Sequence, residues 1–120
     1  QPFLDVIPSA PTRAEERTIA PHPSLKPQAF MRQIVRAALP LGEGVVLDPF
    51  MGGGSTIAAA TAVGYDSIGI ECDRTFYGIA ERAIPRLAKL VLRGAASPRD
   101  YAQIALFTPR PDDGADPQGR

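Results

Sequence analysis

The sequence predicts a small α/β domain in which parallel strands alternate with helices. Residues 45–47 form an apolar run. An acid, a glycine turn and an alanine-rich segment over residues 56–63 follow it in that order. Residues 67–71 form a second short run, which also ends in a carboxylate. A strand–helix–strand unit of this length is a right-handed parallel crossover, so both carboxylates are expected at the edge where open α/β sheets bind ligands.

The glycine turn is the part of this unit that suits a ligand. Residues 45–47 have the pattern of a central strand that is covered on both faces. Glycines 52–54 allow positive φ and a close approach to the backbone. Ser55 and Thr56 are expected to cap the next helix, whose N–H groups face the turn. Because Asp48 would repel a bare phosphate, the turn favours hydroxyl groups or a cationic group.

Two further helices are expected to flank this unit. Pro27 suits the first position of a helix that Pro40 and Gly42 end. The apolar face of this helix comprises Phe30, Ile34, Val35 and Ala38. Gly64 is placed to end the alanine-rich helix in a left-handed cap.

A third helix is expected to start near Asp73 or Arg74. It carries Phe76, Ile79, Ala80, Ala83, Leu87, Leu90 and Val91. Pro85 lies within it, so a kink or a break is expected near Ile84.

The two ends of the chain look less regular. Residues 1–20 are rich in proline and charge, and they are expected to be an extended or loosely attached segment with a possible edge strand at 3–7. Ser97 resembles the cap of a short helix that reaches Leu106. Residues 108–120 are expected to be disordered. The predicted domain therefore covers residues 21–107.

Composition excludes several classes of protein. The 120 residues suffice for one small domain, and 13 basic residues balance 13 acidic ones, so no basic excess indicates a nucleic-acid module. The basic run from Arg82 to Arg99 is interpreted as a solvated helix face. The single Cys72 excludes an internal disulfide and a cysteine zinc site. With no membrane span or signal peptide, a cytoplasmic setting is expected; Gln1 in place of Met suggests a fragment or processed product.

The positions of the two acids relative to the glycines limit which class of ligand the turn can bind. Glu71 follows the glycines at close to the roughly 20-residue offset at which an acid holds ribose hydroxyls, and Cys72 could pack against an adenine. The last glycine of a dinucleotide pattern counted from Gly52 falls on Ile57, and no Gly-Lys-Ser/Thr of a phosphate loop follows. S-adenosylmethionine (AdoMet), with ribose hydroxyls and a cationic methionine part, fits the remaining features. Asp48 as a plain helix cap and Glu71 as a solvated strand end are the structural alternatives.

Three motifs resemble one family. Residues 47–56, Leu-Asp-Pro-Phe-Met-Gly-Gly-Gly-Ser-Thr, are similar to the AdoMet motif of DNA methyltransferases that modify adenine N6 or cytosine N4. Residues 22–27 resemble the His-Pro-x-x-Lys-Pro element that precedes this motif in the β-type order of the family. Residues 69–71 with Tyr77 resemble the Gly-Ile-Glu…Tyr element that follows. The resemblance covers about residues 20 to 92 and implies a truncated Rossmann-like AdoMet-dependent methyltransferase fold, a parallel sheet with flanking helices.

The resemblance also implies roles for individual residues. The methionine side of AdoMet would be lined by Asp48, Phe50, Gly52 and Gly54, and its carboxylate would lie near Ser55 and Thr56. Glu71 would hold the ribose. Lys26 would fix the methionine end. Pro49 and Cys72 complete the implied cofactor-binding set, whereas His22 is expected to shape the turn. No metal site is expected.

The chain departs from the family pattern in one respect. The catalytic element of the family is Asp/Asn/Ser-Pro-Pro-Tyr/Phe, and this chain has no Pro-Pro pair. We therefore expect the cofactor-binding half of a DNA methyltransferase, inactive alone, with residues 1–20 as the end of an upstream target-recognition region. DNA would be contacted through parts mostly absent here, and self-association or pairing with the catalytic half is expected. The alternatives are an AdoMet enzyme acting on RNA or a small molecule, and a non-catalytic chain of a split enzyme.

Overall fold

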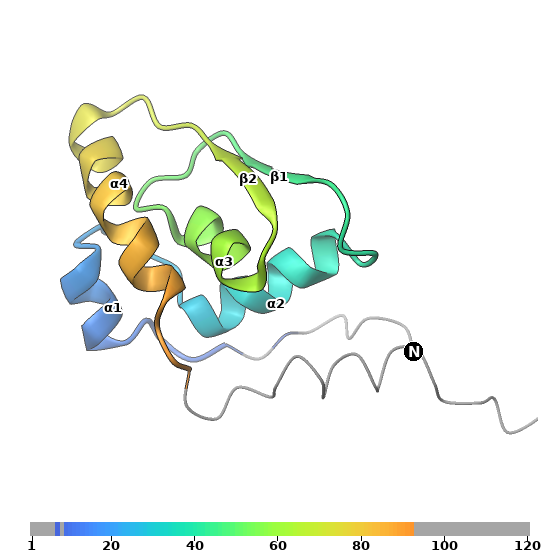
Figure 1. Ribbon diagram of the computed structural model, residues 1–120. Helices are drawn as coiled ribbons and strands as arrows, with labels where there is room; N and C mark the ends of the chain where they lie inside the picture. The colour runs from blue at the N-terminus through green and yellow to red at the C-terminus, as the bar shows by residue number, and fades with distance from the viewer. Residues whose placement is uncertain (1–6, 8, 93–120) are drawn as a thin grey trace, which may run out of the picture. The chain divides into compact units, whose positions relative to one another are not determined.

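The computed structural model describes residue 7 and residues 9–92, which all fall within one compact unit (Figure 1). In chain order the elements are α1 (Ala14–Ile19), α2 (Gln28–Ala38), β1 (Val45–Asp48), α3 (Ser55–Val63), β2 (Asp66–Gly69) and α4 (Arg74–Ala88). The predicted α/β class is confirmed for this part of the chain. The expected strand at 3–7, the helix at 97–106 and the tail at 108–120 lie outside the described residues, Ile7 excepted.

The strand–helix–strand unit forms as predicted. Within the described residues β1 and β2 make a two-stranded parallel sheet, with Val45 opposite Asp66 and Asp48 opposite Gly69. β2 ends at Gly69, so Glu71 lies just beyond the strand rather than at its last position. Both acids nevertheless follow the carboxyl ends of neighbouring parallel strands.

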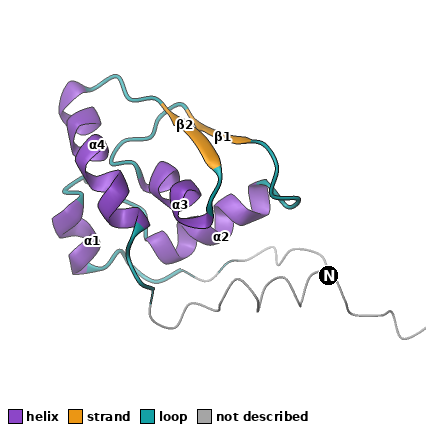
Figure 2. Ribbon diagram, in the orientation of Figure 1, coloured by secondary structure: helices purple, strands orange, loops and turns teal. Residues whose placement is uncertain are grey.

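The sheet is covered on one face only, which contradicts the expected central strand. α3 packs against both strands, and Val46 joins the cluster of Met31, Val35, Ala59 and Ala60 (Figure 2). On the opposite face the exposed fractions are 55% for Val45, 60% for Leu47, 55% for Ile68 and 52% for Ile70. The apolar sequence pattern is therefore satisfied on one side, and no described element covers the other.

α3 starts in a different way from the prediction. Gly54, with φ of 84°, is the N-cap, and no side chain caps the helix. Ser55 instead accepts a hydrogen bond from Lys26, so the expected Ser55 and Thr56 caps are wrong. At the other end Gly64 adopts φ of 82° and donates to the Ala60 carbonyl, which confirms the left-handed cap.

α2 begins one residue later than expected, with Pro27 as its N-cap. Its buried residues are Gln28, Met31 and Val35, whereas Ala38 is exposed. The buried stripe is therefore displaced from the predicted one, because the polar side chain of Gln28 takes a core position, where its Nε2 donates to the Ser55 carbonyl.

Of the kink or break predicted near Ile84, the break does not occur, because α4 runs through Pro85 to Ala88. A proline inside a helix removes one backbone bond, and buried Ala83 and Leu87 on either side hold the segment in the core. Asp73 caps the helix by accepting from Phe76 N. No helix in the described residues is long and apolar enough to cross a membrane.

α1 contradicts the expected loose segment. Residues 14–19 are helical and contact α4, and Glu16 is only 2% exposed. The Glu16 carboxylate accepts a hydrogen bond from Arg13 N in a capping box, which stabilises this short helix. The proline and charge of the segment had predicted an extended chain instead. The assignment of residues 1–20 to an upstream region stays a prediction.

Candidate cofactor site

The glycine turn is fixed to the carboxyl edge of the sheet. Ile70 N donates to the Asp48 carbonyl at 2.9 Å, and Met51 N donates to the Ile70 carbonyl at 3.0 Å. The Asp48 side chain turns back to accept from Phe50 N at 3.1 Å. Gly52 adopts φ of 51°, the left-handed conformation that glycine tolerates best. The turn is therefore held from β2 as well as from β1.

The segment before α2 lies over this turn. Lys26 N donates to Ser55 Oγ at 3.0 Å. His22 covers the glycines closely: a Cβ on Gly52 would lie 3.0 Å from the ring atom Cε1 of His22, and a Cβ on Gly53 would lie 2.9 Å from His22 Cβ. The same ring packs edge-on against Phe76, with centroids 4.3 Å apart. His22 Nδ1 accepts from Ser24 N at 3.1 Å, so His22 shapes the turn, as the sequence predicts.

These two segments line an open cavity of about 290 Å³, just below the range of about 300–1,000 Å³ for ligand pockets. Its lining residues are His22, Ser24, Lys26, Phe30, Met31, Asp48, Phe50, Met51, Gly52, Gly53, Ser55 and Thr56. Six of the ten predicted site residues therefore meet in one cavity. Pro49, Gly54, Glu71 and Cys72 are not among its lining residues.

Glu71 is joined to the turn although it does not line the cavity. Its Oε2 accepts from Gly52 N at 3.0 Å, and its Oε1 accepts from Asp73 N at 2.8 Å. The carboxylate thus links the glycine turn to the start of α4. Each oxygen still has a second lone pair that can accept a hydrogen bond from a hydroxyl.

The other three residues outside the cavity differ in their surroundings. Gly54 is buried, and a Cβ there would lie 2.7 Å from Ile84 Cγ1, so its small size serves helix packing. Pro49 and Cys72 are exposed. Among the described residues, no group of three or more His, Cys, Asp or Glu could hold a metal ion.

The sequence did not predict Gln28 and Glu16, which hold the segments that line the site. Gln28 is fully buried and donates from Nε2 to the Ser55 carbonyl at 2.9 Å. Glu16 accepts from Gln28 N. A glutamate three residues after a helix start could have signalled Glu16, but Arg13 takes the place that serine or threonine usually holds in that pattern.

The comparisons with known proteins identify the family of the chain. Residues 3–82 match the DNA methylase family model N6_N4_Mtase, and the chain therefore belongs to the N6/N4 DNA methylase family. It is 37% identical over 78 residues to the type II methyltransferase M.ScaI of Streptomyces caespitosus, which covers 65% of this chain and 25% of that protein. It is 31% identical over 80 residues to the type II methyltransferase M2.DpnII of Streptococcus pneumoniae, which covers 67% and 30%.

The chain thus spans well under half the length of these curated relatives. No solved structure matches it significantly. The family that the three motifs resembled is confirmed.

Proposed function

We propose that this chain is the AdoMet-binding portion of a DNA methyltransferase that methylates an exocyclic amino group, adenine N6 or cytosine N4. The observation that carries the proposal is the single cavity in which the Lys26 segment meets the Asp48 glycine turn, joined by the hydrogen bond from Lys26 N to Ser55 Oγ. Family membership supports the reaction, because the matching model describes a DNA methylase.

The side chains around the cavity fit the cofactor chemically. AdoMet has a cationic sulfonium and ammonium, a carboxylate, and a ribose with two hydroxyls. Asp48 offers a carboxylate to the cationic groups, Lys26 offers an ammonium to the carboxylate, and the glycines leave room for a close approach. Glu71, bonded to Gly52 N, would accept the ribose hydroxyls at the rim.

When bound, AdoMet supplies the methyl group that the target amine attacks in line. The residues of this chain would bind and orient the cofactor, and orientation accounts for much of the acceleration in such a transfer. The flipped-out base would be held by a Pro-Pro-Tyr-type loop elsewhere in the enzyme, because this sequence has no Pro-Pro pair. DNA contacts would also come mainly from those other parts, and the uncovered sheet face suits their packing.

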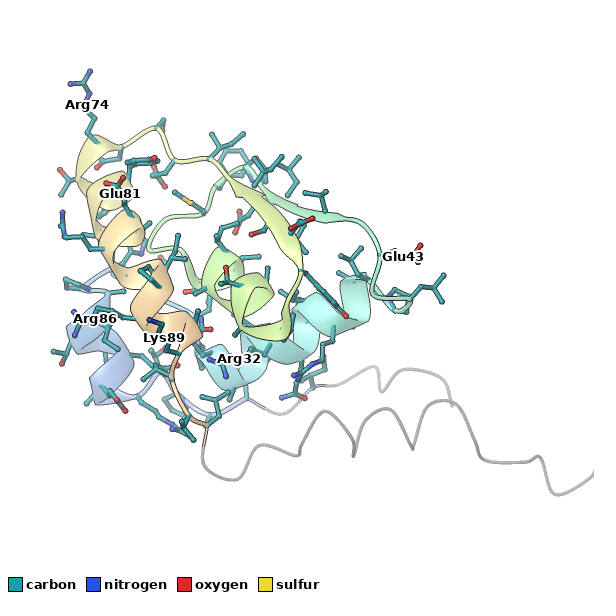
Figure 3. All side chains as sticks on the ribbon, in the orientation of Figure 1. Arg32, Glu43, Arg74, Glu81, Arg86 and Lys89 are labelled. Atoms are coloured by element: carbon teal, nitrogen blue, oxygen red, sulfur yellow. The ribbon has the colours of Figure 1, made fainter. Side chains whose placement is uncertain are left out.

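Calorimetric titration of AdoMet tests the site. We expect Glu71→Ala to weaken AdoMet about tenfold or more, because it removes a charged acceptor of the ribose and the partner of Gly52 N. Glu43→Ala is the matched control, since Glu43 is exposed in the loop before β1 (Figure 3). Equal affinities of wild type and Glu71→Ala would count against the ribose role.

Methyl transfer tests the division of labour. With labelled AdoMet and DNA, the chain by itself is expected to transfer no methyl group, because it lacks the loop that would hold the base. Turnover by the isolated chain would show that this division is wrong, whatever the cofactor affinity.

A further inference from the structure

Glu16 is a buried carboxylate that the proposed function does not use. Its side chain lies below the Lys26 segment and is 2% exposed. Oε2 accepts from Arg13 N at 2.8 Å, and Oε1 accepts from Gln28 N at 2.7 Å. The two oxygens therefore hold the backbone N–H groups of the residue before α1 and of the first residue of α2, which makes Glu16 a link between α1 and α2.

A helix start and a cation lie near the Glu16 carboxylate. Gln28 is the first residue of α2, so the carboxylate lies at the positive end of that helix dipole. Burial and the charge of Arg36 lower the pKa of Arg32, while the Glu16 carboxylate opposes that lowering and raises the Arg32 pKa. Glu16 and Arg32 are thus close enough to interact electrostatically.

A short chain of hydrogen bonds leads from Glu16 to the cavity. Gln28, whose N–H Glu16 accepts, donates from its side chain to the Ser55 carbonyl at 2.9 Å. Ser55 Oγ in turn accepts from Lys26 N. Thr12 Oγ1 donates to the Leu25 carbonyl at 2.9 Å. Residues 25–28 are therefore held from the α1 side at both ends and pressed against the start of α3.

We propose that Glu16 is a positioning residue of the cofactor site, with Thr12 as its helper. It touches no ligand; it fixes the Lys26 segment against the glycine-turn helix, so that Lys26 faces the methionine end of the cavity. This inference rests on the proposed AdoMet function. If Glu16 were lost, Gln28 N–H would have no acceptor in a fully buried position, and residues 25–28 would move to relieve it.

Glu16→Gln tests the proposal with almost no change in shape. An amide can accept only one of the two N–H groups and turns its own donor toward the other. We expect AdoMet affinity to fall about tenfold, since a charge-assisted hydrogen bond is lost. Adenosine, which lacks the methionine end, should lose less than about twofold. An equal loss for both ligands, or none for either, would overturn the proposal.

Val63→Ala is the matched control for a merely structural effect. Val63 is partly buried at the far end of α3 and shares no hydrogen bond with the Glu16 network. Measured at a temperature where each variant is folded, it should leave the ratio of AdoMet to adenosine affinity unchanged. The same selective loss in Val63→Ala would show that Glu16 acts only through stability.

A second variant and a second readout keep the outcome clear. If Glu16→Gln does not fold, Thr12→Val removes the other tie and should give a smaller selective loss, about threefold. In ¹H–¹⁵N spectra without ligand, Glu16→Gln should shift the Lys26 and Ser55 amides. Unshifted amides would overturn the positioning role, whereas shifted amides with no AdoMet binding by wild type would overturn only the proposed function.

Discussion

Two glycines with the same left-handed backbone conformation differ in their surroundings, so alanine substitutions at them distinguish the cost of backbone strain from the cost of overpacking. Gly54 and Gly64 have φ of 84° and 82°, but a Cβ on Gly54 would meet Ile84 at 2.7 Å, whereas a Cβ on Gly64 would meet nothing within 4 Å. We expect Gly64→Ala to cost about 1–2 kcal/mol of unfolding free energy from left-handed strain alone. Gly54→Ala should cost a further 1–3 kcal/mol, roughly, from overpacking. Urea denaturation measures both, and equal losses would contradict the packing role of Gly54.

Motifs in the sequence predicted several of the residues that line the cavity, but not the backbone contacts of Glu71. The acid, the glycines and Lys26 were predictable because each belongs to a recognisable pattern, and the structure brings six of those ten residues to one cavity. Glu71 was predicted as a ribose ligand, with a solvated strand end as the alternative, yet both of its oxygens accept hydrogen bonds from backbone N–H groups. Backbone partners leave no mark in the sequence, so its link to the turn could not be foreseen.

At the scale of elements, Arg32 of α2 caps the end of α4. Its Nη2 donates to the carbonyls of Leu87, Ala88 and Leu90 at 3.0, 3.2 and 3.1 Å (Figure 3). We expect Arg32→Met to lower the free energy of unfolding by about 1–3 kcal/mol, because three carbonyls lose a charged donor. Arg82→Met, at an exposed position of the same helix α4, should change it by less than about 0.5 kcal/mol. Thermal denaturation compares the two, and equal shifts would argue against the cap.

The elements themselves were predictable where local pattern and packing agree. β1, α3 and β2 follow directly from the apolar runs, the glycines and the crossover rule, and their parallel pairing is confirmed. α1 was missed because its stability comes from one buried carboxylate and from contacts with α4, not from periodicity. Of the kink or break predicted at Pro85, the break does not occur, because tertiary packing outweighs the loss of one backbone bond.

At the scale of the whole molecule, the sheet shows why sequence pattern and structure differ. Residues 45–47 have the composition of a strand covered on both faces, but the described residues supply helices on one face only. The curated relatives are more than three times as long as the part that this chain matches. We infer that the composition suits the complete methyltransferase, in which additional protein would pack on the second face.

The uncovered sheet face predicts how the isolated chain behaves. Val45, Leu47, Ile68 and Ile70 lie together there, each more than half exposed. An apolar patch of this kind promotes association, so a second copy should cover it in solution. We expect Leu47→Lys to reduce binding of a hydrophobic dye and to shift sedimentation toward monomer. Leu41→Lys is the matched control, because Leu41 is 88% exposed but lies in the loop before β1. A monomeric wild type, or an equal effect of both variants, would show that this face does not drive association.

Leu47→Lys should leave AdoMet affinity unchanged, since Leu47 points away from α3 and does not line the cavity.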